Sequence, residues 1–294
     1  MGERMSKAQE QSPSAWGPNA CRAAVSVTFD NLGEAADLER GKWPAGEQPG
    51  DHFSVRRTLP RILRVLDEVG IRSTFYVEGI NAELYPGALL GIARAGHEVG
   101  YHGWRHEYWT HLDPSEEAER LQRGIRRMEA LGLRPRGFRP PGGRLNPSTA
   151  RSLRDLGFTH FSPAGRGTGV CGPLAALPFE WHLTDAYHYL PRFENLRKAA
   201  TGSTHALPPS HLRETFGSAM RDALREGNHL SLLFHPFLED PQERFVAMRS
   251  VLRELRGLVR AGAVWCAPHR DVASSILCSP GAFRDKTRLD QTKT

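Results

Sequence analysis

The sequence is poor in lysine, in cysteine and in long apolar runs, and each shortage excludes a class of protein. No stretch approaches the roughly 18 uninterrupted apolar residues of a membrane span, so we expect neither a membrane segment nor a membrane partner. Only five of the 39 basic residues are lysines, and the arginines are scattered along the chain. Since no basic run is interleaved with aromatic residues, the net charge of +6 does not indicate a nucleic-acid partner.

The few cysteines and the polar N-terminus indicate a compartment. The four cysteines lie at wide, irregular spacings without a Cys-x-x-Cys pair: Cys21, Cys171, Cys266 and Cys278. This pattern fits free thiols in a reducing compartment rather than a disulfide framework or a zinc knuckle. Residues 1–19 contain no apolar signal-peptide core, so we expect a cytoplasmic protein. We expect one domain over residues 21–280, with disordered tails at 1–20 and 281–294.

Short apolar segments rich in β-forming residues alternate with helical patterns. The candidate strands are 24–29, 73–77, 97–101, 137–139, 159–162, 178–183, 229–234 and 264–267. Apolar residues recur at helical spacing over 55–69, 118–131 and 245–259, and Asp113 with Glu116 forms a capping box. Strands separated by helices pair in parallel, which predicts an α/β fold: a distorted (β/α) barrel of seven to eight parallel strands, with a doubly wound open sheet as the alternative. The glycine-rich segment 163–176 is expected to be a long loop, either near the site or a passive connection.

Four polar clusters directly follow candidate strands, at 28–31, 102–106, 139–143 and 235–236. Parallel α/β folds collect ligands at the carboxyl ends of their strands, so these clusters are expected to meet. His102 and His106, four residues apart, can converge on one metal ion, although a pair bonded to the backbone at a helix start is the alternative. With Asp30 as general base and His235 as general acid, the set predicts a metal-dependent amide hydrolase.

The order of these motifs resembles the NodB-type polysaccharide deacetylases, carbohydrate esterase family 4, from about residue 24 to residue 267. The resemblance implies that Asp30 is the base, that His235 is the acid, and that Arg139 orients the base. It implies that His102 and His106 bind a divalent metal ion, zinc, with cobalt or nickel as alternatives. It also places the backbone N–H of Gly142 in the oxyanion hole. Further candidate residues for contact with the substrate or its oxyanion are Pro141, Trp104 and Asp185.

The sequence departs from the family pattern at three places: at Asn31, at Gly142, which stands where the family has an aromatic residue, and in the segment 178–185. Asn31 stands where the family's second aspartate binds the metal, and a neutral amide oxygen holds an ion more weakly. Glu34, three residues on, is an alternative ligand or a surface or capping residue. The segment 178–185 resembles a divergent branch that contains peptidoglycan deacetylase-like, cyclic imidase-like and ureide hydrolase-like proteins. Asp185, in that segment, is expected to bind substrate, to pair with Arg139 or to cap a helix.

The predicted function is removal of an acetyl or formyl group from the amide nitrogen of an amino sugar or a related small biosynthetic metabolite. The substrate partner is therefore a small N-acylated molecule. Trp104, Tyr108 and Trp109 form an aromatic cluster that serves either as a sugar-stacking platform or as barrel packing. Two other functions stay open: a cyclic imide or ureide amidohydrolase on the same fold, and a catalytically silent carbohydrate-binding protein, which Asn31 favours.

Overall fold

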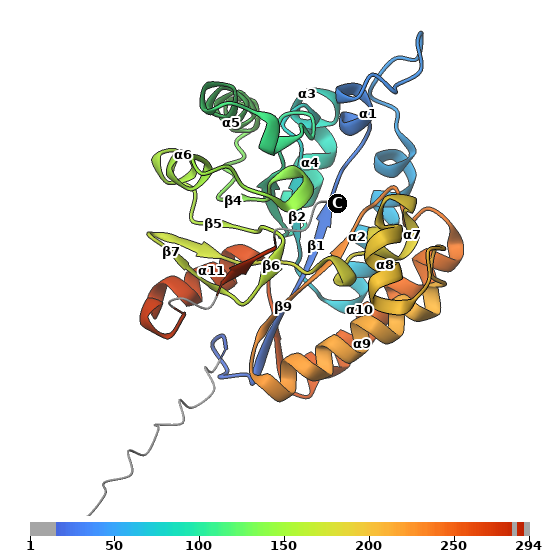
Figure 1. Ribbon diagram of the computed structural model, residues 1–294, viewed down its shortest axis with the longest axis vertical. Helices are drawn as coiled ribbons and strands as arrows, with labels where there is room; N and C mark the ends of the chain where they lie inside the picture. Colours follow the sequence, from blue (N-terminus) through green and yellow to red (C-terminus); the bar gives the residue numbers. More distant parts are fainter. Residues whose placement is uncertain (1–15, 284–286, 291–294) are drawn as a thin grey trace, which may run out of the picture.

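A curled, mostly parallel sheet forms the centre of the computed structural model, which describes residues 16–283 and 287–290 (Figure 1). The order of eight of its nine strands is β10-β1-β2-β3-β4-β5-β8-β7, and β9 pairs with β1. Among the described strands of this sheet, β7 and β8 are the antiparallel pair, and β6 and β11 form a separate antiparallel pair. The strands are β1 (Ala23–Asp30), β2 (Thr74–Val77), β3 (Glu98–Tyr101), β4 (Gly137–Phe138), β5 (His160–Phe161), β6 (Gly165–Arg166), β7 (Gly169–Cys171), β8 (Leu174–Ala176), β9 (His229–Phe234), β10 (Val264–Cys266) and β11 (Arg288–Leu289).

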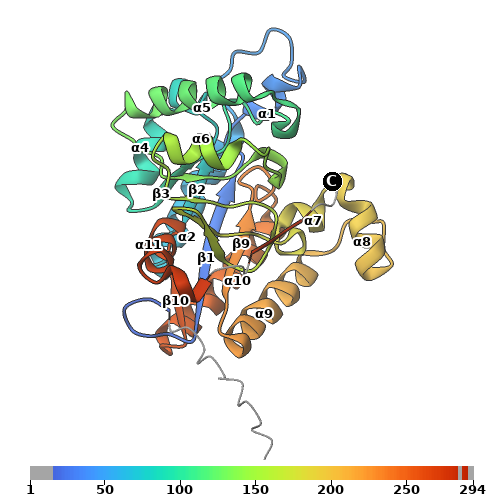
Figure 2. The same ribbon diagram turned by 60° about the vertical axis from the view of Figure 1, so that its left-hand side comes forward.

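Helices surround the curled sheet (Figures 1 and 2). They are α1 (Ala35–Glu39), α2 (Leu59–Val69), α3 (Asn81–Leu84), α4 (Pro86–Arg94), α5 (Pro114–Glu129), α6 (Thr149–Asp155), α7 (Asp185–Tyr189), α8 (Glu194–Thr201), α9 (Pro209–Glu226), α10 (Gln242–Arg260) and α11 (His269–Cys278). No β-ladder joins β8 to β9 in the described residues. An isolated parallel β-bridge between Thr184, which follows a 3-10 turn, and Leu233 of β9 connects this part of the chain to the sheet. The predicted α/β fold class, a distorted barrel, is confirmed in this half-barrel form.

The predicted helical spacings correspond to α2, α5 and α10. In α2 the buried residues Leu59, Ile62 and Leu66 recur on one face, as a helix against the sheet requires. At the start of α5 the Asp113 carboxylate accepts from the amide of Glu116, whose own carboxylate accepts from the amide of Asp113. This capping box begins α5 at the predicted place.

One predicted strand is wrong. Residues 181–183 of the expected strand form the 3-10 turn η4 (Trp181–Leu183), and the sheet instead takes β8 from the segment expected to be a loop. Pro178 has no amide hydrogen to give to a ladder, which disfavours a central strand there. Upstream, Gly172 has φ +59°, which allows the tight turn that pairs Cys171 of β7 with Leu174 of β8.

Parts of both expected tails are packed. Trp16 is 2% exposed, its indole N–H donates to the carbonyl of Gly227 at 2.8 Å, and its ring centroid lies 5.3 Å from that of Phe283. Near the other end, β11 pairs with β6. These contacts pack residues that we expected to be disordered because the termini are polar in composition. The rest of the expected tails, 1–15, 284–286 and 291–294, lies outside the described residues.

Two further observations concern thiols and membranes. All four cysteines are free thiols in the structure. Among the described residues, no helix combines the length and the apolar composition that crossing a bilayer requires.

The register of the parallel strands positions the candidate site. Phe29 of β1 is paired with Phe234 of β9, so the residues that follow them, Asp30 and His235, are neighbours. Likewise, Tyr101 of β3 is paired with Phe138 of β4, which places His102 beside Arg139. Because parallel strands end at the same edge, the backbone brings all four residues to one end of the barrel.

Candidate active site

Arg139 holds Asp30 at the end of β1. The Arg139 side chain is fully buried, and its Nη1 donates to Asp30 Oδ1 at 2.8 Å and to Thr28 Oγ1 at 2.9 Å. Its Nη2 and Nε donate to Ser162 Oγ at 2.8 and 3.2 Å, and its Cζ lies 4.4 Å from the ring centroid of Tyr76. These partners offset the cost of burying the guanidinium. With Oδ1 engaged by Arg139, Oδ2 is the oxygen of Asp30 that remains to accept a proton.

His235 is held by Asp185. The Nδ1 of His235 lies 2.5 Å from Asp185 Oδ1, and its backbone N–H donates to Asp185 Oδ2 at 2.6 Å. Asp185 is fully buried at the first position of α7. One of the expectations for Asp185 was an ion pair with Arg139. In the structure its carboxylate contacts His235 instead. A carboxylate at Nδ1 orients the imidazole and leaves Nε2 as the atom that can exchange a proton.

His102 and His106 face one another as neutral rings. His102 Nδ1 donates to the carbonyl of Arg139 at 2.8 Å, which leaves the Nε2 lone pair free, 3.8 Å from Asp30 Oδ2. The ring of His106 lies edge-on, with centroids 4.9 Å apart. Burial lowers the pKa of His102, and burial together with the neighbouring His102 lowers the pKa of His106 well below its usual value. Neutral imidazole is the form that binds metal ions.

The residues around the His pair offer an incomplete donor set for a divalent ion. In the described chain no three His, Cys, Asp or Glu side chains converge as a metal cluster, so the third protein ligand would be the amide oxygen of Asn31. Asn31 follows Asp30 directly, with φ +59°, a conformation that asparagine tolerates better than most residues. Arg40 Nη2 lies 3.1 Å from His106 Nδ1 and donates to it, which favours a proton on Nε2 and competes with coordination through that atom.

Glu34 is excluded as the alternative ligand. Its side chain is fully buried, Oε1 accepts from the amide of Gly50 at 2.6 Å, and Oε2 accepts from the hydroxyl of Tyr85 at 2.5 Å. Both oxygens therefore have structural partners, and Glu34 anchors the loop that follows α1.

Pro141 and Gly142 form a tight turn directly after Arg139. The 3-10 turn η3 (Pro141–Gly143) buries Pro141 and exposes Gly142, which has φ +73°. A Cβ added at Gly142 would meet no atom within 4 Å, so the space beside this residue is open. An open, exposed backbone at this position is compatible with the predicted role of the Gly142 amide as an oxyanion donor.

The structure corrects the prediction that Trp104 contacts substrate. Its indole is 2% exposed, packs against Ala35 and Ile80, and lies 4.0 Å from the guanidinium carbon of Arg123. Barrel packing, the second interpretation, accounts for it. Of the predicted aromatic cluster only Tyr108, at 60% exposure, is accessible.

Sequence reasoning missed two residues of the site. Ser162 ends a candidate strand, so the rule that found Arg139 applies to it as well. Arg40 carries no such signal, because it lies 66 residues from His106 and follows a helix rather than a strand.

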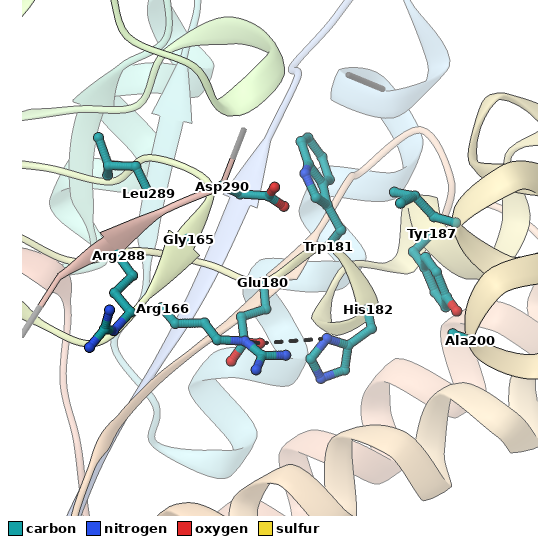
Figure 3. A pocket seen from close by; sticks show the side chains of 11 residues that line it. Gly165, Arg166, Glu180, Trp181, His182, Tyr187, Ala200, Arg288, Leu289 and Asp290 are labelled. Carbon is teal, nitrogen blue, oxygen red and sulfur yellow. Dashed lines mark hydrogen bonds and ion pairs between the residues drawn. The ribbon is translucent and has the colours of Figure 1, made fainter. Parts of the chain in front are cut away.

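A separate cavity of about 440 Å³ lies beside η4 (Figure 3). Trp181, Tyr187 and Leu289 line it, and on its polar side Glu180 contacts Arg166 at 2.5 Å and His182 at 3.8 Å. None of the predicted catalytic or metal-binding residues is among its lining residues.

Comparison with known proteins is consistent with this geometry. A model of the polysaccharide deacetylase family matches residues 19–161, a range that includes Asp30, His102, His106 and Arg139 and ends before His235. A peptidoglycan deacetylase-like protein of Gibberella zeae, FGM2, is 36% identical over 140 residues, which are 46% of this chain. The chain spans only 41% of the length of that relative.

Solved structures match over nearly the whole chain. A Mycobacterium smegmatis protein assigned as a polysaccharide deacetylase is 27% identical, with a TM-score of 0.80, and the match covers 97% of this chain and 99% of that one. The Puue allantoinase, at 20% identity and a TM-score of 0.72, covers 92% of this chain and 95% of its own. The second similarity shows the shared fold alone.

Proposed function

We propose that this chain, whose residues 19–161 match the polysaccharide deacetylase family, is a metal-dependent hydrolase. It would remove an acetyl or formyl group from the amide nitrogen of an amino sugar or a related small metabolite. The observation that carries the proposal is the pairing of a carboxylate with an imidazole at neighbouring strand ends. Asp30 is held by Arg139 at 2.8 Å, and His235 is held by Asp185 at 2.5 Å. The names of the relatives, which refer to peptidoglycan and polysaccharide deacetylation, support an amino-sugar amide.

Asp30 acts as the general base. Its Oδ2, which Arg139 does not occupy, accepts a proton from the water that attacks the carbonyl carbon of the amide. The guanidinium of Arg139 keeps the carboxylate oriented during this transfer. A positioned base contributes about 10² to 10⁴ in rate.

His235 acts as the general acid. Its protonated Nε2 donates to the amide nitrogen as the bond between carbon and nitrogen breaks, which releases an amine and a carboxylic acid. Asp185 stabilises the imidazolium form before the transfer. The two proton transfers thus use two residues whose partners are already in place, so little reorganisation is needed.

The backbone amide of Gly142, beside which the space is open, would stabilise the negative charge that develops on the carbonyl oxygen. A divalent ion, held by His102, His106 and the amide oxygen of Asn31, would supply Lewis-acid polarisation of the substrate amide.

The proposal is tested by measuring release of acetate and formate from a panel of N-acetyl and N-formyl amino sugars. Each substrate is assayed with added zinc, cobalt or nickel and again with chelator, and Asp30→Asn serves as the matched inactive variant. Release that depends on the metal and on Asp30 supports the proposal. Failure to release either acid from any substrate, or release that is indifferent to both changes, refutes it.

A further inference from the structure

Aromatic rings pack against the guanidinium of Arg139, in addition to its hydrogen bonds. The N–H groups donate at the edges of the guanidinium plane, to Asp30 Oδ1 and to two buried hydroxyls. The guanidinium carbon also lies over two rings, 4.4 Å from the centroid of Tyr76 and 4.8 Å from that of Phe179. Because a guanidinium stacks on aromatic faces, these rings oppose a tilt of Arg139 away from Asp30.

Tyr76 is also the neighbour of Asp30 in the sheet. The ladder between β1 and β2 pairs Asp30 with Tyr76, so the two side chains point to the same face of the sheet. Arg139 reaches this face from the end of β4, donates to the Asp30 carboxylate at 2.8 Å and stacks on the Tyr76 ring. The ring therefore supports the contact that orients the base.

The ring of Tyr76 is itself fixed at its hydroxyl end. Tyr76 is fully buried, its hydroxyl oxygen lies 2.7 Å from His269 Nδ1, and His269 Nε2 lies 3.0 Å from Ser231 Oγ. Burial raises the pKa of Tyr76 well above its usual value and lowers the pKa of His269 well below its own. The phenol is therefore protonated and the imidazole neutral, so the hydroxyl donates to Nδ1 and Nε2–H donates to Ser231. Residues of α11 and β9 thus anchor a ring of β2.

We propose that Tyr76 is a positioning residue for the base: its ring, anchored through His269, holds the guanidinium of Arg139 and thereby the carboxylate of Asp30. Tyr76 is fully buried, so it acts through Arg139 rather than on the substrate. A proton acceptor that leaves its place slows the chemical step, because the reacting atoms must be aligned. The inference rests on the proposed function, in which Asp30 accepts the proton of the attacking water.

The first test follows the Nε–H group of Arg139 by NMR in the full chain without substrate, after through-bond assignment from its backbone. This group donates to Ser162 Oγ at 3.2 Å, so its exchange with solvent reports how often the guanidinium leaves its place. We expect exchange at least about tenfold faster in Tyr76→Leu, which removes the ring. Tyr76→Phe, which keeps the ring but loses its anchor, should exchange about threefold faster than the unmodified protein.

The matched control is Phe245→Leu in α10. Phe245 is also a buried ring beneath a guanidinium, with Arg61 Cζ 4.0 Å from its centroid, but that guanidinium donates to Asp240 and Gln242. The control should leave the exchange of the Arg139 group unchanged. An Arg139 exchange rate in either Tyr76 variant that equals the rate in Phe245→Leu overturns the inference. If Tyr76→Leu does not fold, Tyr76→Phe alone decides.

Turnover separates a positioning role from a merely structural one. Because Asp30 acts in the chemical step and Tyr76 does not contact the substrate, Tyr76→Leu should lower kcat about tenfold while KM stays within about twofold. Tyr76→Phe should retain more of kcat than Tyr76→Leu, and Phe245→Leu should retain all of it. Equal kcat in Tyr76→Leu and Phe245→Leu contradicts the positioning role.

The two measurements distinguish failure of the inference from failure of the proposed function. Faster exchange in the Tyr76 variants of a protein that releases no acyl group would refute the hydrolase and keep the support of Arg139 by Tyr76. Turnover in the unmodified protein together with unchanged exchange in both variants would keep the hydrolase and overturn the inference.

Discussion

Asp185 contacts His235 at two points, with Oδ1 2.5 Å from the ring Nδ1 and Oδ2 accepting from the backbone N–H at 2.6 Å. One carboxylate thus orients both the backbone and the imidazole of the same residue. The His235 side chain is therefore positioned by a residue of α7, although it lies at the end of β9.

Replacing Asp185 by asparagine should lower turnover by about 10² to 10⁴, as for other histidines that lose an orienting carboxylate. The asparagine amide keeps the size of the side chain but loses the carboxylate oxygens that fix the ring and the backbone N–H of His235. Steady-state turnover measures this effect, with the exposed Asp155→Asn as control. Equal turnover in the two variants would show that Asp185 does not orient His235 for the reaction.

Ser162→Ala should destabilise the fold. The Ser162 hydroxyl is the acceptor for Arg139 Nε and Nη2, and its removal leaves buried donors without a partner. We expect the free energy of unfolding to fall by about 1–3 kcal/mol in urea titrations. Ser250→Ala, a helix-surface change on α10, should stay within about 0.5 kcal/mol of the unmodified protein. Equal losses in the two variants would contradict the role given to Ser162.

Asn31→Asp should tighten metal binding. A carboxylate in place of the neutral amide adds a charged ligand beside His102 and His106, and aspartate also tolerates the positive φ of this position. Competition with a chromophoric chelator should show zinc held at least about tenfold more tightly than in the unmodified protein. His102→Ala should lose the ion. Unchanged affinity in Asn31→Asp would mean that position 31 does not face the metal.

Glu78→Gln should remove a pH dependence of stability. Burial raises the pKa of Glu78 to about 8, and its Oε1 has no hydrogen-bond partner. Between about pH 4.5 and pH 8 the native state keeps a proton that the unfolded chain loses, so stability falls as pH rises through this window. The variant should gain stability relative to the unmodified protein by about 1.4 kcal/mol per pH unit there.

The measurement for Glu78→Gln is urea unfolding at pH 5, 6, 7 and 8, reported as the difference between variant and unmodified protein. Glu214→Gln, on the exposed face of α9, is the control and should give a flat difference. A flat difference for Glu78→Gln as well would mean that this carboxyl is ionised in the native state.

Much of the barrel was predictable because its strands are short apolar runs that end in polar motifs. Asp30, His102, Arg139 and His235 each follow a strand, and parallel register then makes them neighbours. The strand expected at 178–183 was not correct, because Leu174–Ala176 competes for the same sheet position and its hairpin depends on a glycine turn. The local sequence pattern does not show which of these two segments joins the sheet.

Contacts between distant segments were not predictable. Asp185 was identified as a site residue, but its partner was not, because the contact depends on how α7 packs beside β9. Arg40 was missed for the same reason. Trp104 follows His102 by two residues, but it is buried against Ala35 and Ile80, which belong to distant segments and could not be identified as its neighbours from the sequence.

The most direct test of this mechanism is the turnover of Asp30→Asn on the best N-acyl substrate. Turnover is measured as the release of acetate or formate, and circular dichroism checks that the variant is folded. Asp30 lies at a strand end beside His235 and is held by Arg139. We expect a folded variant whose turnover is lower by about 10² to 10⁴. A folded Asp30→Asn variant that retains the turnover of the unmodified protein would contradict it.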